Sequence, residues 1–261
     1  MKKFSFILML LALMLFIAAC GSDDEGSTGG DSGESSEGET YTVGIDTTYP
    51  PFEFEEDGEY TGIDIDLINA IADNQGFDIE FSAMDFGGII PAMQAGQLDV
   101  AIAGMSITED RKEIVDFSDP YFEAGISLVV NEDNNDITSL EDLEGKTVVV
   151  KSGTTGADFA RENQEEYGFE ITQLDDSPAM FQEVSNGNAD VLFEDYPVIA
   201  YAIAESDLDL KVVGDRLTGD EYGIAVLKGE NADLLDQINA GLQELRDSGE
   251  YDEILNKYIA E

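Results

Sequence analysis

The chain has 261 residues, and its 58 Asp and Glu residues against 12 Lys and Arg residues give a formal net charge of −46. So acidic a protein repels the phosphates of nucleic acids, and we therefore expect no nucleic-acid partner. The absence of His excludes His-dependent catalytic triads and His-ligated zinc or haem, and a single Cys excludes an internal disulfide. The hydrophobic fraction of 43% is sufficient for a folded core, and the length allows one or two domains.

The surplus of acidic residues is interpreted as a solvated surface rather than as a cation site. The acidic stretch from Asp133 to Asp136 lacks the Gly that the sharp turn of an EF-hand calcium loop requires. We therefore expect neither a metal ion nor a cofactor.

Residues 1–19 have the features of a secretory signal peptide, with an uncleaved membrane anchor as the alternative. After Lys2 and Lys3, the apolar run from Phe4 to Ala19 is shorter than the roughly 20 apolar residues of a spanning helix. The sequence Ile17-Ala18-Ala19-Cys20-Gly21 resembles the lipobox of bacterial lipoproteins, in which the Cys is lipidated and becomes the mature N-terminus. This resemblance predicts a lipid anchor on Cys20 that holds the protein at the outer face of the bacterial cell membrane.

Residues 20–40 are predicted to be the lipidated Cys followed by a disordered acidic tether. From Gly21 to Thr40 the chain consists of Gly, Ser, Thr and acidic residues, so it cannot bury enough apolar surface to offset its ordering entropy. A flexible chain of this length spans about 25 Å.

Strands and helices are predicted to alternate from Tyr41 to Glu261, which indicates an α/β fold. The expected strands are, in chain order, 41–45, 77–81, 100–103, 126–130, 147–150, 191–193 and 222–227. The expected helices are one that Asp64 caps and that includes 67–72, then 89–95 with Pro91 in its first turn, 108–115, one after Gly156, 177–186 with Ser177 as its cap, 196–204, and one from Asn231 to Gly249. The number of these elements favours two lobes over one large sheet.

Several polar residues are predicted to lie at strand ends or helix starts, where α/β proteins bind ligands. Asp46 and Asp195 lie at strand ends, and Lys151-Ser152-Gly153-Thr154-Thr155-Gly156 presents backbone N–H groups to an anion. Arg111 lies in the first turn of a helix, and its guanidinium can bind a carboxylate with two hydrogen bonds. The alternatives are surface acids, a turn-forming loop and a surface salt bridge.

Taken together, these segments resemble the polar amino-acid-binding proteins of ABC importers, within the family 3 extracellular solute-binding proteins. The motifs that carry the resemblance are Gly44 to Phe54, Gly62 to Leu67, Met84 to Ala92, Ala103 to Arg111, Asp116 to Tyr121, Lys151 to Thr155 and Glu194 to Pro197. The family has the type II periplasmic-binding-protein fold, in which two α/β lobes are joined by two crossover strands and the ligand cleft lies between the lobes. The resemblance implies lobe 1 at 41–120 and 223–261, lobe 2 at 126–217, and hinges at 121–125 and 218–222.

The resemblance also implies a role for each site residue. Arg111 would bind the α-carboxylate of an amino acid, aided by Ser106, Thr154 and Thr155 of the two loops. Asp195 would bind the α-ammonium together with the Gly104 carbonyl and the Ser106 hydroxyl. Tyr49 and Phe86 would enclose the ligand side chain, and Asp46 and Lys151 would select it.

Asp46 can accept from an amide N–H and Lys151 can donate to an amide oxygen, so the pair matches glutamine. Glutamate ranks second and the basic amino acids third. This sequence departs from close relatives at Glu194, where some glutamine-binding members have His, and at Thr155, where Gly is frequent.

The expected protein is a monomeric, lipid-anchored receptor that delivers an amino acid to the permease subunits of an ABC transporter. It is not expected to be an enzyme and has no predicted catalytic residue. The alternatives are a dehydratase-like enzyme on the same fold and a sensory module.

Overall fold

A computed structural model describes residues 39–206 and 208–259. The chain divides into two units, 1–37 and 38–261, and every element below belongs to the second. The predicted signal peptide, the lipidation site Cys20 and nearly all of the predicted tether lie outside the described residues. Within the described ranges, no helix is both long enough and apolar enough to cross a membrane.

The first sheet has five strands in the order β5-β1-β6-β15-β7. β1 (Thr40–Ile45) pairs in parallel with β5 (Asp78–Ala83) and β6 (Val100–Ala101). β15 (Ala225–Leu227) is antiparallel to both β6 and β7 (Val115–Phe117). This sheet therefore combines strands from the beginning of the folded unit with one that lies more than a hundred residues later.

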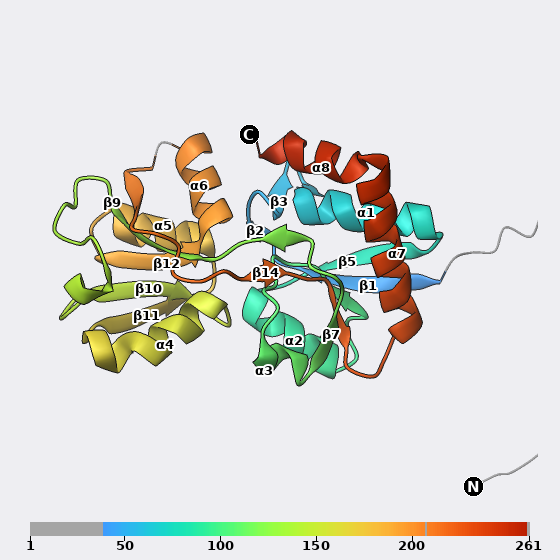
Figure 1. The fold of residues 1–261 in the computed structure, drawn as a ribbon, viewed down its shortest axis with the longest axis horizontal. Helices are drawn as coiled ribbons and strands as arrows, with labels where there is room; N and C mark the ends of the chain where they lie inside the picture. Colours follow the sequence, from blue (N-terminus) through green and yellow to red (C-terminus); the bar gives the residue numbers. More distant parts are fainter. Residues whose placement is uncertain (1–38, 207, 260–261) are drawn as a thin grey trace, which may run out of the picture. The chain divides into compact units, whose positions relative to one another are not determined.

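Helices cover both faces of the first sheet (Figure 1). α1 (Ile63–Gln75) and α7 (Ala232–Ser248) pack together on one face, followed by α8 (Glu250–Tyr258). α2 (Phe86–Gln94) lies on the other face, near the short helix α3 (Glu109–Lys112). The buried apolar side chains of the helices and strands form the core of this lobe.

The second sheet has five strands in the order β11-β10-β12-β9-β13. β10 (Thr147–Lys151) pairs in parallel with β11 (Glu170–Leu174) and β12 (Val191–Asp195). β9 (Ile126–Asn131) is antiparallel to both β12 and β13 (Leu210–Val213). Both sheets thus contain three parallel strands, and the first of these in sequence, β1 or β10, lies in the middle. The next strand in each sheet, β15 or β9, is antiparallel, and the chain enters it from the other sheet.

The second sheet also has helices on both faces. In Figure 1, α4 (Thr155–Tyr167) lies on one side, and α5 (Ser177–Ser185) and α6 (Tyr196–Glu205) lie on the other. A short 3-10 helix, η1 (Leu140–Asp142), contacts α4. Together the two sheets and their helices confirm the predicted α/β class.

Two small sheets complete the structure. β8 (Phe122–Glu123) pairs antiparallel with β14 (Glu221–Tyr222), and these are the two segments through which the chain leaves one large sheet for the other. β2 (Thr48–Tyr49), β3 (Glu53–Glu56) and β4 (Glu59–Thr61) form an antiparallel meander directly after β1.

Three local predictions were wrong. Gly62, not Asp64, is the N-cap of α1, because the Asp64 side chain turns inward and accepts hydrogen bonds from other segments. α2 begins at Phe86, so Pro91 lies inside the helix rather than in its first turn. α5 is capped by Asp176, whose carboxylate accepts from the N–H of Ala179 at 2.8 Å, while Ser177 begins the helix itself.

Candidate functional site

A small cavity lies at the carboxyl ends of the parallel strands of both sheets. Nine of the ten residues that the sequence predicts for ligand binding line it: Tyr49, Phe86, Gly104, Ser106, Arg111, Lys151, Thr154, Thr155 and Asp195. The tenth, Asp46, contacts the ammonium group of Lys151.

Arg111 is a buried cation that forms no ion pair with any carboxylate of the described residues. Its guanidinium donates to the carbonyl oxygens of Ser106 at 2.7 Å and Gly153 at 3.1 Å, and lies 5.2 Å from the centre of the Phe86 ring. Burial lowers the pKa of Arg111, but a guanidinium stays protonated in proteins. The side chain therefore keeps unused N–H donors and a positive charge at the cavity.

Thr108 fixes the start of the helix that presents Arg111. As predicted, its hydroxyl caps α3, accepting from the backbone N–H of Arg111 at 3.2 Å. The helix is only one turn long, shorter than the predicted 108–115.

Asp195, at the end of β12, is the buried anion of the cavity and is held by two tyrosine hydroxyls. Tyr49 donates to Asp195 Oδ2 at 2.8 Å and Tyr222 donates to the same oxygen at 2.6 Å. Burial raises the pKa of Asp195, and these two hydrogen bonds oppose that shift. The carboxylate is thus stabilised by neutral donors and keeps its charge available for a cation.

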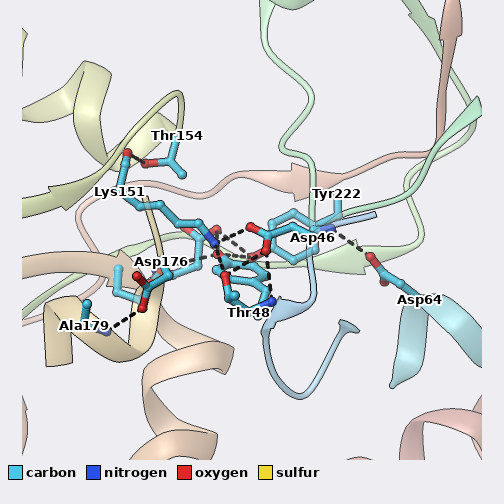
Figure 2. Close-up of polar contacts among 12 residues, drawn as sticks. Asp46, Thr48, Asp64, Lys151, Thr154, Asp176, Ala179 and Tyr222 are labelled. Carbon is cyan, nitrogen blue, oxygen red and sulfur yellow. Dashed lines mark hydrogen bonds and ion pairs between the residues drawn. The ribbon is translucent and has the colours of Figure 1, made fainter. Parts of the chain in front are cut away.

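Lys151 and Asp46 form an ion pair between the ends of β10 and β1, with 2.5 Å between Lys151 Nζ and Asp46 Oδ2. Figure 2 shows the lysine extending toward Asp46 and Thr48, and Lys151 Nζ donates to Thr48 Oγ1 at 3.2 Å. Asp46 Oδ1 accepts from the Thr48 hydroxyl at 2.7 Å. Both charges are almost completely buried, and they place a donor and an acceptor side by side.

Thr154 and Thr155 begin the helix α4 beside the cavity. Thr154 Oγ1 accepts from the N–H of Ala157 at 3.3 Å and donates to the Lys151 carbonyl at 2.8 Å, so its hydroxyl serves as the helix cap. Thr155 is the first helical residue, and the N–H groups of a first turn lack partners within the helix.

Two close approaches shape the site, one to an aromatic ring and one between backbones, and each depends on glycine. Gly104 has φ +52°, and a Cβ there would lie 2.6 Å from Cε1 of the Tyr49 ring. Gly153 has φ +78°, and a Cβ there would lie 2.8 Å from Cα of Gly87, which belongs to α2. The loops before α4 and at the start of α2 therefore meet in van der Waals contact.

Two buried carboxyls, Glu53 and Asp64, lie behind the cavity residue Gly104 and were not predicted from the sequence to belong to the site. Asp64 Oδ2 accepts from the N–H of Gly104 at 2.8 Å and from the hydroxyl of Tyr121 at 2.9 Å. Burial raises the pKa of Asp64 to about 6, and burial together with the charge of Asp64 raises the pKa of Glu53. Its hydrogen bond lets Asp64 fix the backbone that carries Gly104.

Thr48, Tyr222 and Glu194 also belong to the site and were not predicted to bind the ligand. Tyr222 reaches Asp195 from β14, and Glu194 accepts from the Tyr49 hydroxyl at 3.1 Å. The one signal available in the sequence was position, because Glu194 is adjacent to Asp195 and Thr48 is close to Asp46. The described residues contain no group of three or more Cys, Asp or Glu side chains arranged to hold a metal ion.

Residues 41–261 match the family model of the bacterial extracellular solute-binding proteins, family 3. The arginine-binding extracellular protein ArtP of Bacillus subtilis is 32% identical over 260 residues, which are 99% of this chain and 98% of that protein. The ABC transporter glutamine-binding protein GlnH of the same organism is 35% identical over 276 residues, which are 100% of this chain and 98% of that protein.

Solved structures give the same result. An ancestral arginine-binding protein bound to arginine has a TM-score of 0.80 and 45% identity over 86% of this chain and 100% of its own. An ancestral amino acid-binding protein described as a precursor of cyclohexadienyl dehydratase has a TM-score of 0.77 and 39% identity over 84% of this chain and 95% of its own. These matches and the two sheets confirm the type II periplasmic-binding-protein fold.

The chain belongs to the family 3 bacterial extracellular solute-binding proteins, as the resemblance predicted. Membership of this family assigns it to the extracytoplasmic proteins of solute uptake.

Glu53→Gln should make the stability of the protein less sensitive to a rise in pH. A carboxyl whose pKa is raised by folding stabilises the protein fully below its unfolded pKa, and this contribution is lost as the pH rises toward the folded pKa. Gln keeps an N–H donor toward Asp64, and because it does not ionise, its contribution to stability does not fall as the pH rises. As the pH rises above the unfolded pKa of a glutamate, the free energy of unfolding of the variant should rise relative to wild type by up to about 1.4 kcal/mol per pH unit.

Urea unfolding at several pH values measures this difference. The matched control is Glu59→Gln, which removes an exposed carboxyl from the neighbouring strand β4 and should run parallel to wild type. A constant difference between Glu53→Gln and wild type at all pH values would contradict the raised pKa of Glu53.

Proposed function

We propose that the protein binds one polar L-amino acid outside the cytoplasm, glutamine first, and delivers it to the permease subunits of an ABC transporter. The observation that carries this proposal is the pair of opposite charges at the cavity. Arg111 and Asp195 are both buried and both line it, yet each is held by neutral groups and not by the other. A free amino acid brings one carboxylate and one ammonium, which are the groups that these two charges lack.

The geometry supports a defined orientation of the ligand. The α-carboxylate accepts from the Arg111 guanidinium, from the N–H groups at the start of α4 near Thr155, and from Ser106. The α-ammonium donates to Asp195, with the Gly104 carbonyl and the Ser106 hydroxyl beside it. Tyr49 and Phe86 enclose the aliphatic part of the side chain.

The Asp46–Lys151 pair supports the choice of glutamine. A primary amide can donate an N–H to Asp46 and accept from Lys151, so both ends of the ion pair gain a partner. Glutamate would bring a second anion to Asp46, and lysine or arginine would bring a second cation to Lys151. Glutamate therefore ranks second and the basic amino acids third, although the ancestral arginine-binding protein has been solved with glutamine as well as with arginine bound.

Ligand capture is proposed to close two lobes, lobe 1 at 41–120 and 223–261 and lobe 2 at 126–217. The proposed hinges, 121–125 and 218–222, contain the paired strands β8 and β14. Because a ligand that contacts both lobes binds the closed state better, it shifts the population toward closure. The closed, monomeric receptor is the form that the permease subunits recognise.

An enzyme on the same fold is the second candidate, because one structural neighbour is described as the precursor of a dehydratase. We propose binding without turnover, because Asp195, the cavity carboxylate that could act as an acid or base, is the proposed partner of the ligand ammonium. A sensory module remains the third candidate.

Calorimetric titration of the full chain with the twenty amino acids and with cystine should give the smallest dissociation constant for glutamine. Tightest binding to arginine or cystine would contradict the selection by Asp46 and Lys151. Recovery of each amino acid unchanged after prolonged incubation distinguishes a receptor from an enzyme.

Arg111→Ala should abolish measurable binding, because no other cation in the cavity can take the α-carboxylate while Lys151 is paired with Asp46. Asp195→Asn should weaken binding by at least about 2 kcal/mol, because the ammonium is left poorly paired. The matched control is Arg161→Ala, which removes an exposed arginine of α4 that pairs with Asp158. Equal affinities for Arg111→Ala and Arg161→Ala would contradict the proposed site.

Cys20 is proposed to carry the lipid anchor, with residues 1–19 as the cleaved signal peptide and the segment to residue 40 as the tether. Buried acyl chains contribute about 0.8 kcal/mol per methylene, so two or three chains hold a protein domain at a membrane. Cys20→Ser should move the protein from the membrane fraction of expressing bacteria to the soluble extracytoplasmic fraction. Unchanged membrane retention of the variant would contradict the anchor.

A further inference from the structure

Glu194 and Asp195 are consecutive residues of β12, yet both carboxylates reach the same hydroxyl group. Successive strand residues normally point to opposite faces of a sheet. Here Glu194 Oε1 accepts the N–H of Asp195 at 2.9 Å, which turns the glutamate back along its own strand. Tyr49 Oη then lies 3.1 Å from Glu194 Oε1 and 2.8 Å from Asp195 Oδ2.

The surroundings of this pair supply too few hydrogen-bond donors for two carboxylates. Tyr49 has one hydroxyl proton for the two acids, and Tyr222 donates to Asp195 only. Glu194 Oε2 is buried and makes no hydrogen bond within the described ranges.

Three other groups face Glu194 from neighbouring elements: Lys151 of β10, Tyr222 of β14 and the Ser177 hydroxyl of α5. Lys151 is the single cation among them, and its ammonium already pairs with Asp46 at 2.5 Å. The hydroxyl of Ser177 helps to lower the pKa of Glu194, although Ser177 Oγ forms no hydrogen bond of good geometry. The negative charge of the pair is therefore only partly balanced by the protein.

Burial, and after it the charge of Asp195, raises the pKa of Glu194 to about 7. Burial raises the pKa of Asp195 in the same direction. Two interacting carboxyls of this kind titrate as a unit, and near neutral pH the unit holds a proton for part of the time.

We propose that Glu194 and Asp195 share one proton in the ligand-free protein, and that binding of an amino-acid ammonium at Asp195 expels this proton from Glu194 to solvent. The inference rests on the proposed function, because the ammonium is that of the proposed ligand. The balance is simple: a glutamic acid becomes a glutamate, its proton passes to the buffer, and the ammonium supplies the positive charge that replaces it. Glu194 thereby sets how the affinity for the amino acid depends on pH. The sequence did not predict this role for Glu194.

The sign of the effect follows from linkage. An ammonium beside the pair favours the charged form of Glu194 and lowers its pKa, so the liganded protein binds fewer protons than the free protein. Affinity therefore falls as the pH drops below about 7, by at most about tenfold per pH unit. Above the free-state pKa, no proton is released and affinity is independent of this group.

Calorimetry of the full chain with glutamine, and in parallel with arginine, in buffers of different ionisation enthalpy tests this inference. Both ligands carry an α-ammonium, so for both the apparent binding enthalpy should change linearly with the buffer enthalpy. The slope should correspond to the release of about half a proton at a pH near the pKa of Glu194, and should approach zero about two pH units higher.

Glu194→Gln keeps an oxygen acceptor for the N–H of Asp195 and for the Tyr49 hydroxyl, but cannot ionise. This variant should bind with no buffer-dependent enthalpy and with nearly constant affinity between about pH 6 and about pH 8. The matched control is Glu166→Gln, which removes an exposed carboxyl from α4 of the same lobe and should release the same proton as wild type.

The outcomes separate the two proposals. Tight binding of either ligand by wild type without proton release overturns the inference and leaves the proposed function intact. Equal proton release by wild type and Glu194→Gln also overturns it. If none of the twenty amino acids binds to wild type, both the inference and the proposed function fail. If the variant folds poorly, the wild type still decides against the inference when it binds either ligand without releasing a proton near pH 7.

Discussion

The site depends on two buried, opposite charges that are kept from neutralising each other. Arg111 is satisfied by the carbonyls of Ser106 and Gly153, and Asp195 by the hydroxyls of Tyr49 and Tyr222. A direct Arg–Asp ion pair would remove both charges from the cavity, whereas neutral dipoles stabilise each charge and leave it available. This arrangement explains how a protein with a net charge of −46 can present a local field that suits a zwitterion.

The duplicated topology of the two sheets explains why these charges converge. In each sheet the parallel strands end at the cavity, so residues at their carboxyl ends approach one another although they are far apart in sequence. Asp46 and Lys151 pair across this junction, and the glycine contact between Gly87 and Gly153 allows the two backbones to touch. Larger side chains at these glycines would hold the strand ends apart, and the charges that these strand ends carry would be separated as well.

The alternation of elements and the strand-end positions were predictable because they depend on local pattern. The cavity therefore contains nine of the ten predicted residues, while their ligand roles stay predictions. Asp64 was wrongly assigned as a helix cap because its partners, Gly104 and Tyr121, lie 40 and 57 residues away. Tyr222 was missed for the same reason: it joins Asp195 only through β14, which no local pattern connects with β12. Buried polar pairing is a tertiary property, and it is where reasoning from local sequence fails.

The interrupted order of the first sheet has a consequence for synthesis on the ribosome. All five strands of the second sheet come from one uninterrupted stretch, 126–213, whereas β6 and β7 flank a place that only β15 can fill. The amino-terminal half therefore emerges first, but β6 and β7 lack the strand that pairs with both of them until residues 225–227 have been translated. Domains usually fold in the order in which they are made. Here the part that begins the chain is completed last, and a chaperone would meet its exposed strand edges in the meantime.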